Sequence, residues 1–222
     1  MERIKMAVNY KSVFDIIGPV MIGPSSSHTA GAVAIGRAAN RIFHDTPTKV
    51  VIHYYESFAE THKGHGTDYA IISGILGFEP DDSRVPDAIP IAKKQGIDVT
   101  FIEEDGDSPI GHPNTAIIEL SNAQRKVIVS GCSIGGGTIE IREIKMDGFD
   151  IKPKGPLPIL LMQGRDDDHR AVSEKLAKVT SVNDEATYHT TTGTLYEYDL
   201  ENRLKNHDLD DLAKDHSQIV YL

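Results

Sequence analysis

Three serines and a histidine stand together at the start of an alanine-rich stretch, "GPSSSHTAGAVAIGRAA" at residues 23–39. A serine is a preferred N-cap, because its oxygen accepts hydrogen bonds from the free backbone N–H groups of a first helical turn. Those N–H groups and the positive end of the helix dipole also attract a carboxylate or a phosphate. The stretch therefore fits one cap with spare polar residues, or an anion site with additional hydroxyl ligands. His28 lies seven residues before Ile35 and would face inward in a continuous helix, as a hydrogen-bonded core residue, which the sequence alone favours, or toward a pocket.

A second group of ionisable residues is "ETHKGHGTD" at residues 60–68. Gly64 and Gly66 indicate a backbone that needs positive φ or approaches a ligand closely. The spacing of His62 and His65 could serve a metal ion, but no third ligand is evident in the sequence. A histidine that acts as a general acid or base in a flexible polar loop is the sharper hypothesis.

Two further stretches are rich in histidine or glycine. "GHPNT" (111–115) is typical of a turn, in which the Asn114 side chain hydrogen-bonds its own backbone. "SGCSIGGGT" (130–138) lacks the spacing of a nucleotide-binding loop, so a glycine-rich hairpin is favoured there. No G-x-S-x-G motif is present, which disfavours a hydrolase with a serine nucleophile. Together, four polar loops gather in one region of the chain.

The composition excludes several classes of partner. The chain has 222 residues, and its 23 basic and 33 acidic residues give a formal net charge of −10. This sign argues against nucleic acid or an anionic membrane as the main partner. No apolar run approaches the ~20 residues that cross a bilayer. Asp15, Gly18 and Pro19 interrupt the apolar stretch near the N-terminus, so no signal peptide is expected.

The chain has a single cysteine, Cys132, which limits its redox and metal chemistry. It cannot form an internal disulfide, which suits a reducing cytoplasm. By itself it cannot hold an iron–sulfur cluster or a thiolate zinc site.

The elements that position these motifs follow from hydrophobic periodicity. The first region is expected to be α/β, with a mixed sheet that is antiparallel at one end. Its polar loop covers 58–68, and Pro90 restricts one helix, since proline is tolerated only near a helix start. The predicted helices are 28–43, 69–76 and 83–97, and the predicted strands are 49–57, 98–104, 115–121, 126–134 and 138–144.

A second module follows "DGFDIKPKGPLP" (147–158), which has the composition of a linker. The pattern then reads strand, helix, strand, strand, helix, strand, which is a ferredoxin-like βαββαβ module. We therefore expect a first domain over 1–148, a linker over 149–157 and a second domain over 158–222. The predicted elements of the second domain are 159–163, 167–178, 181–190, 194–199, 208–214 and 217–222.

Four stretches together resemble the β subunit of bacterial iron–sulfur-dependent L-serine dehydratase. They are "SVFDIIGPVMIGPSSSHTAGA", "ETHKGHGTD", "HPNT" and "SIGGGTIEI", and they occur in the family's order over nearly all of residues 10–145. The resemblance implies a fold shared with the allosteric substrate-binding domain of some phosphoglycerate dehydrogenases, followed by an ACT domain. The loop "GRDDDHRAV" departs from the ACT pattern, because no glycine follows Gly164. Dimerisation or a vestigial role is therefore favoured over amino-acid binding.

The resemblance also implies a reaction. L-serine loses water by β-elimination, and the resulting aminoacrylate tautomerises and hydrolyses to pyruvate and ammonia. A [4Fe-4S] cluster, one iron of which acts as Lewis acid on the leaving hydroxyl, replaces pyridoxal phosphate. The cluster cysteines lie in a partner α subunit, so no metal ligand is expected in this chain. The assembly is expected to be a cytoplasmic homodimer or heterotetramer. The alternative is a non-catalytic module that only senses L-serine.

Site residues carry over from the matching motifs. The leading acid–base candidates are His65 and His112, with His28 close behind and His62 ranked lower. The resemblance, with the anion-binding physics of a helix N-terminus, places the serine carboxylate against the helix start. The substrate-binding candidates are Ser25, Ser26, Ser27, Thr29, Gly66, Thr67, Asp68 and Asn114.

Overall fold

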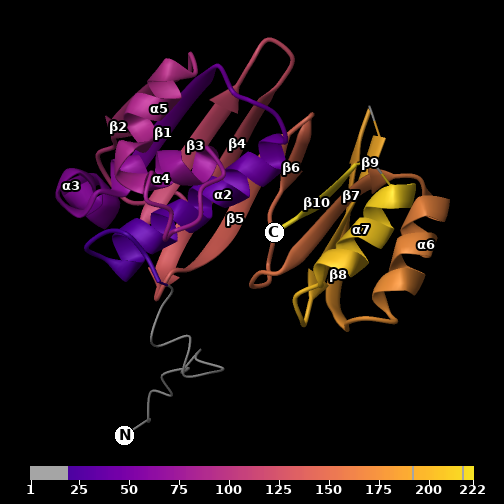
Figure 1. Ribbon diagram of the computed structural model, residues 1–222. Helices are drawn as coiled ribbons and strands as arrows, with labels where there is room; N and C mark the ends of the chain where they lie inside the picture. The colour runs from indigo at the N-terminus through magenta and orange to yellow at the C-terminus, as the bar shows by residue number, and fades with distance from the viewer. Residues whose placement is uncertain (1–19, 192, 217) are drawn as a thin grey trace, which may run out of the picture.

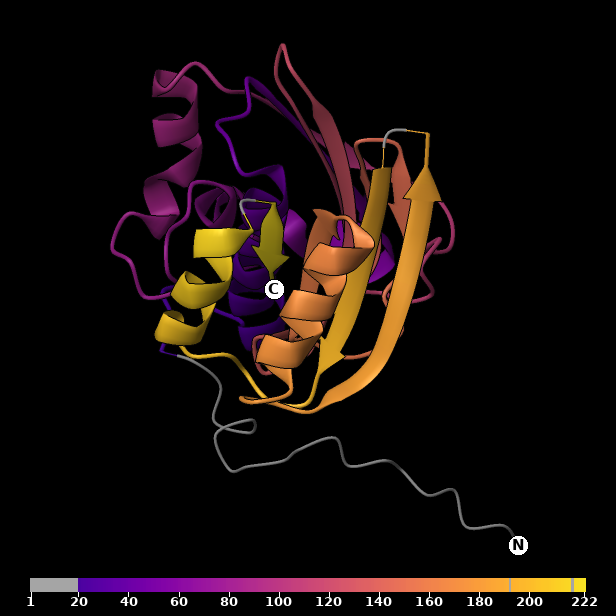
Figure 2. The same ribbon diagram turned by 90° about the vertical axis from the view of Figure 1, so that its right-hand side faces the viewer.

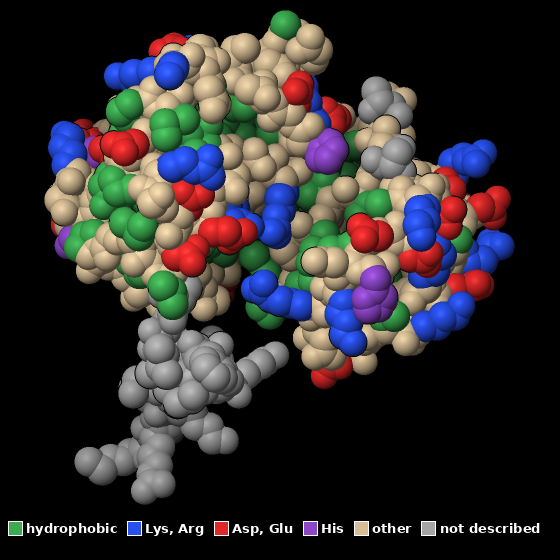
Figure 3. Space-filling view, viewed as in Figure 1, with side chains coloured by type: hydrophobic (Ala, Val, Ile, Leu, Met, Phe, Trp, Pro, Cys, Tyr) green, Lys and Arg blue, Asp and Glu red, His purple; other side chains and the backbone are tan. Residues whose placement is uncertain are grey.

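A computed structural model describes residues 20–222 except 192 and 217. Residues 12–19, which begin the first resemblance motif, and the rest of the predicted domain before Val20 lie outside this range. Two sheets stand side by side, each with helices on one face (Figure 1). On the face shown in Figure 3, acidic and basic side chains are interspersed.

The first sheet has six strands in the order β2-β1-β3-β4-β5-β6. Strands β1 and β2 are parallel, and every other neighbouring pair is antiparallel. This confirms the predicted mixed sheet with an antiparallel end. The strands are β1 (Lys49–Tyr55), β2 (Asp98–Glu103), β3 (Thr115–Ser121), β4 (Lys126–Gly135), β5 (Thr138–Met146) and β6 (Phe149–Ile151).

Helices cover one face of this sheet (Figure 1). Gly36 and Gly74 bring two of them, α2 and α4, together, because a Cβ atom on either glycine would collide with the backbone of the other helix. The helical segments are η1 (Ser26–Ala30), α2 (Gly31–Phe43), α3 (Glu56–His65), α4 (Thr67–Ile75), η2 (Val85–Asp87) and α5 (Ala88–Lys94).

The prediction of a polar loop over 58–68 is wrong, because most of this segment is helix α3. Phe58 anchors the helix in the core with none of its surface exposed. Gly66 then ends the helix with φ of 69°, and α4 starts at once with Thr67. The glycine thus marks a break between two helices rather than a loop. The predicted helix over 83–97 is shorter, and Pro90 is the third residue of α5, where proline is tolerated.

The second sheet has four antiparallel strands in the order β10-β7-β9-β8. Helices α6 and α7 cover one of its faces (Figure 2). The chain order is βαββαβ, as predicted, whereas the ACT-like assignment stays a prediction. The elements are β7 (Ile159–Gly164), α6 (Asp166–Leu176), β8 (Val182–Thr190), β9 (Gly193–Leu200), α7 (Asn206–Asp215) and β10 (Ile219–Tyr221).

The two sheets share one apolar core. Leu161 and Leu195, on the face of the second sheet away from its helices, belong to the same buried cluster as the first sheet's core residues. The first residues of the predicted linker, 149–151, form strand β6 and pair with β5. The division of the chain into two domains at 149–157 stays a prediction. Within the described residues, no helix has both the length and the hydropathy of a membrane-spanning helix.

Candidate functional site

The serine stretch forms a wide first turn before α2. The backbone N–H groups of Thr29 and Ala30 both approach the carbonyl oxygen of Ser25, at 2.9 and 3.3 Å, so η1 is a π turn. The Ser25 Oγ accepts a hydrogen bond from the His28 backbone N–H at 3.1 Å. The predicted capping serine is therefore Ser25. The wide turn leaves Ser26 exposed and Ser27 half-buried, and such π turns are frequent at functional sites.

His28 lies beside a second histidine rather than in the core, contrary to the expectation from helix periodicity alone. Its ring centroid is 4.7 Å from that of His65, and its Nε2 lies 3.2 Å from the Ser57 Oγ. The π turn explains the difference, because it shifts the residues before α2 out of the α-helical register. Burial, and then the charge of His65, lower the pKa of His28 below its ordinary value of 6.5.

His65 is the last residue of α3 and is tied to the serine turn through its backbone. The Thr29 hydroxyl donates to the His65 carbonyl oxygen at 3.0 Å. The His65 Nδ1 is buried and has no hydrogen-bond partner in the described part of the chain, and the same holds for the Thr67 Oγ1 and the Ser133 Oγ. An unpaired buried polar group costs about 1–3 kcal/mol. Buried polar atoms without a protein partner are typical of places where an ordered water or a ligand completes the hydrogen bonds.

His112 lies in the turn before β3, and backbone hydrogen bonds attach this turn to α3 and β4. The Asn114 backbone N–H donates to the His112 Nδ1 at 3.1 Å, so this turn uses the imidazole as an acceptor. The Pro113 carbonyl accepts from the Phe58 N–H at 3.3 Å, and the Asn114 carbonyl accepts from the Ser133 N–H at 3.0 Å. Burial, and then the charge of Arg142, lower the pKa of His112. The structure thus brings His28 and His65 into contact and places His112 in a neighbouring turn.

The Asp68 carboxylate contacts a third histidine, His62. The His62 Nδ1 lies 2.6 Å from the Asp68 Oδ1, and its Nε2 lies 2.8 Å from the Glu103 Oε1. His62 is 3% exposed. The sequence motifs place His62 below the other histidine candidates and do not include Glu103. The pairing of His62 with Glu103 left no signal in the sequence, since the two residues are 41 positions apart.

The possible metal-ligating side chains of the described residues are dispersed rather than grouped. Among the described residues, no three or more His, Cys, Asp or Glu side chains are grouped to hold a metal ion. Cys132 is buried, and burial raises the pKa of its thiol to about 11. The thiolate that ligates a metal is therefore disfavoured at neutral pH.

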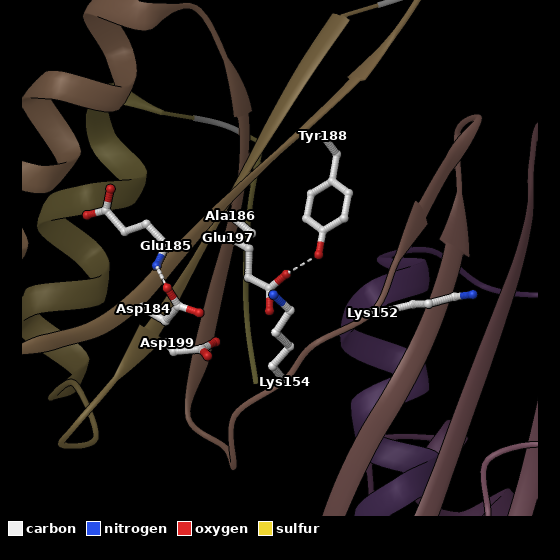
Figure 4. A pocket seen from close by; sticks show the side chains of 8 residues that line it. All are labelled: Lys152, Lys154, Asp184, Glu185, Ala186, Tyr188, Glu197 and Asp199. Carbon is white, nitrogen blue, oxygen red and sulfur yellow. Dashed lines mark hydrogen bonds between the residues drawn. The ribbon is translucent and has the colours of Figure 1, made fainter.

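Another group of ionisable side chains lies on strands β8 and β9 and the segment after β6 (Figure 4). The Tyr188 hydroxyl donates to the Glu197 Oε2 at 2.7 Å. Glu197 and Asp199 are buried, and burial raises the pKa of both carboxyl groups. Lys152 and Lys154 line the same pocket. None of the predicted site residues belongs to this group.

Comparisons with known proteins agree with the resemblance. The family model described as serine dehydratase beta chain matches residues 12–143, which include every predicted site residue. "Probable L-serine dehydratase, beta chain" of Bacillus subtilis is 52% identical over 159 residues, 72% of this chain and 70% of that protein. "L-serine dehydratase, beta chain" of Peptoniphilus asaccharolyticus is 41% identical over 155 residues, 68% of each chain. "L-serine dehydratase 2" of Escherichia coli is 45% identical over 85 residues, 36% of this chain and 18% of that protein.

Proposed function

The chain belongs to the serine dehydratase beta chain family, and from this premise we propose that it provides substrate-binding and acid–base residues for the elimination of water from L-serine. The reaction removes the α-proton and the β-hydroxyl, and the aminoacrylate hydrolyses to pyruvate and ammonia. The observation that carries this proposal is the contact between His28 and His65 at the wide serine turn, with ring centroids 4.7 Å apart.

The serine turn binds the substrate carboxylate. The start of η1 presents backbone N–H groups and the positive end of a helix dipole. Ser26 and Ser27 stand exposed and half-buried at this turn, and the unpaired Thr67 hydroxyl lies on the adjoining helix. Thr29 and Gly66 shape the junction, and Asn114 attaches the neighbouring turn to β4. The full set of proposed binding residues is Ser25, Ser26, Ser27, Thr29, Gly66, Thr67, Asp68 and Asn114.

The histidines move the protons. Removal of the weakly acidic α-proton needs a neutral imidazole, and burial next to His65 lowers the pKa of His28, which favours its neutral form. The two rings contact each other, so both can reach one small substrate from the same side. His112, with its pKa also lowered, is the further acid–base candidate in the adjacent turn.

A partner α subunit supplies the [4Fe-4S] cluster. Two observations support this: the single cysteine of this chain cannot by itself hold a [4Fe-4S] cluster, and curated relatives are named beta chains. The Escherichia coli relative matches this chain over only 18% of its own length, so there the matched segment is part of a longer chain. The proposed location is cytoplasmic, and the proposed assembly is a homodimer of this chain or a heterotetramer with the α subunit.

The second module is proposed to be an ACT-like domain that supports assembly. Its acidic run after Gly164 caps helix α6, since the Asp168 carboxylate accepts from the Arg165 backbone N–H at 2.9 Å. These residues are used locally, which supports dimerisation or a vestigial role over amino-acid binding.

Anaerobic co-expression with an α subunit tests the proposed function. The complex should form pyruvate from L-serine, and His65→Ala should lower kcat by about 10²–10⁴-fold without dissociating it. His189→Ala is the matched control, because His189 lies on β8, outside the proposed site. A complex that binds L-serine in calorimetry but forms no pyruvate would favour the sensing module instead.

A further inference from the structure

His62 is a buried imidazole held between two carboxylates from different elements. It lies on α3, its partner Asp68 lies in the first turn of α4, and Glu103 is the last residue of the edge strand β2. The two bonds, of 2.6 and 2.8 Å, are short. The ring of Tyr54 contacts the imidazole with a centroid distance of 4.8 Å. The side chain thus joins three elements.

Both ring nitrogens of His62 face acceptors. Each contact uses a different nitrogen of the ring, so both polar atoms of the side chain are engaged. Glu103 is ionised over the physiological range, because its bonds to Lys63 and then His62 lower the pKa of its carboxyl group to about 2. A buried polar ring is costly unless its hydrogen-bond partners are in place. The arrangement therefore suits a side chain with two hydrogen-bonding nitrogens in one plane.

The bond between His62 and Asp68 spans the break between α3 and α4. At this break the Gly66 N–H closes on the His62 carbonyl oxygen, and the backbone turns with φ of 69°. His65 stands immediately before the break, so the angle between the two helices decides where its ring lies. Glycine itself does not hold that angle, because it allows many backbone conformations.

We infer that His62 is a positioning residue, which fixes the α3–α4 angle through Asp68 and Glu103 and thereby holds His65 against His28. The inference rests on the proposed function of that histidine pair. The same inference gives Asp68 a role, because its carboxylate bonds His62 across the break between α3 and α4. A misplacement of about 1 Å at an acid–base group can cost a hundredfold in rate.

Kinetics of the complex with the α subunit provide the first test. His62→Phe keeps a flat ring on Tyr54 but removes both bonds, and it should lower kcat about tenfold or more with KM nearly unchanged. His62→Gln keeps one amide donor and should recover part of the loss. Lys63→Met is the matched control, because it removes only the neighbouring exposed ion pair to Glu103 and should leave kcat unchanged. Glu103→Leu, at a half-exposed position, should give a smaller loss than His62→Phe in a folded complex.

Hydrogen exchange of the full chain provides a readout that does not depend on activity. The amides of 66–70 should exchange at least tenfold faster in His62→Phe than in the wild type or in Lys63→Met. Faster exchange together with unchanged kcat would overturn the positioning role, and so would unchanged exchange. A wild-type complex without serine turnover would contradict the proposed function. The exchange result would still show whether His62 holds the start of α4 in place.

Discussion

At the scale of single residues, the charge of one histidine lowers the pKa of its neighbour. His28 is half-buried and faces the ring of His65, and both burial and that neighbouring charge lower its pKa. Neither effect is visible in the sequence, since the two residues are 37 positions apart. The motifs could predict that both histidines matter, but only the wide turn and the end of α3 bring their rings together.

Replacing His65 by glutamine should raise the pKa of His28 toward 6.5, because the charge that opposes its protonation is removed. For the wild type, the neutral base form is lost as pH falls through the lowered pKa, so the acidic limb of the kcat profile should lie below pH 6.5. An NMR titration of the His28 Hε1 signal in the full chain measures the shift directly. A pKa of His28 that is the same in both proteins would show that the two rings are not coupled.

Two adjacent serines of the proposed binding set should differ in how much they stabilise the helix start. Ser25→Ala removes the acceptor for the His28 N–H, and it should lower the free energy of unfolding by about 1 kcal/mol. Ser26 is exposed, so Ser26→Ala should leave the stability unchanged while raising KM for L-serine in the complex. Urea unfolding of the full chain and steady-state kinetics measure the two effects. Equal loss of stability in both variants would contradict this division of roles.

At the scale of elements, the strands were predictable because buried and exposed residues alternate along them, as in β1 and β3. The segment 58–68 was not, because its polar residues and two glycines resemble a loop. Phe58 stabilises this helix through two contacts: its N–H bonds to the Pro113 carbonyl in the turn before β3, and its ring packs in the core. A tertiary contact therefore stabilises a helix that local composition does not indicate.

The close contact of α2 with α4 should depend on its glycines. Gly74→Ala would place a methyl group against the backbone of Val33 and Gly36, which should cost about 1–3 kcal/mol of unfolding free energy. Gly64→Ala is the matched control, because no atom lies within 4 Å of a Cβ at that position in α3. It should be neutral or stabilising by up to about 1 kcal/mol. Thermal unfolding of the full chain compares the two, and equal destabilisation would contradict a role for helix contact.

At the scale of the whole molecule, the two sheets form one body through a shared apolar core that also contains ionisable groups. Leu161 and Leu195 lie in this core, and on the same strand as Leu195 the face continues with Glu197 and Asp199. The side chains of Lys154 and Tyr188 lie nearby (Figure 4). The βαββαβ order was predictable from periodicity, but this contact between sheets was not. The alternation of residues shows which face of a strand is buried, but not which other element covers that face.

The free energy of unfolding should fall as pH rises, because of the buried carboxyl groups Glu197 and Asp199. Burial raises the pKa of Glu197 above 4.5 and that of Asp199 above 3.8, so the folded chain binds protons more tightly than the unfolded chain. The stability that these two carboxyl groups contribute is therefore fully present at pH values below their unfolded-state pKa values. It is lost as pH rises through their raised folded-state pKa values.

Glu197→Gln removes one of these charges, and its amide oxygen can still accept the hydrogen bond from Tyr188. Its Tm should exceed that of the wild type by a few degrees at pH 7, on the order expected for about 1 kcal/mol in a chain of this size. The difference should shrink toward pH 4, where the wild-type carboxyl is protonated. Glu201→Gln, at an exposed position, should show no such trend. A Tm difference that is constant between pH 4 and pH 8 would mean that the Glu197 charge does not oppose folding.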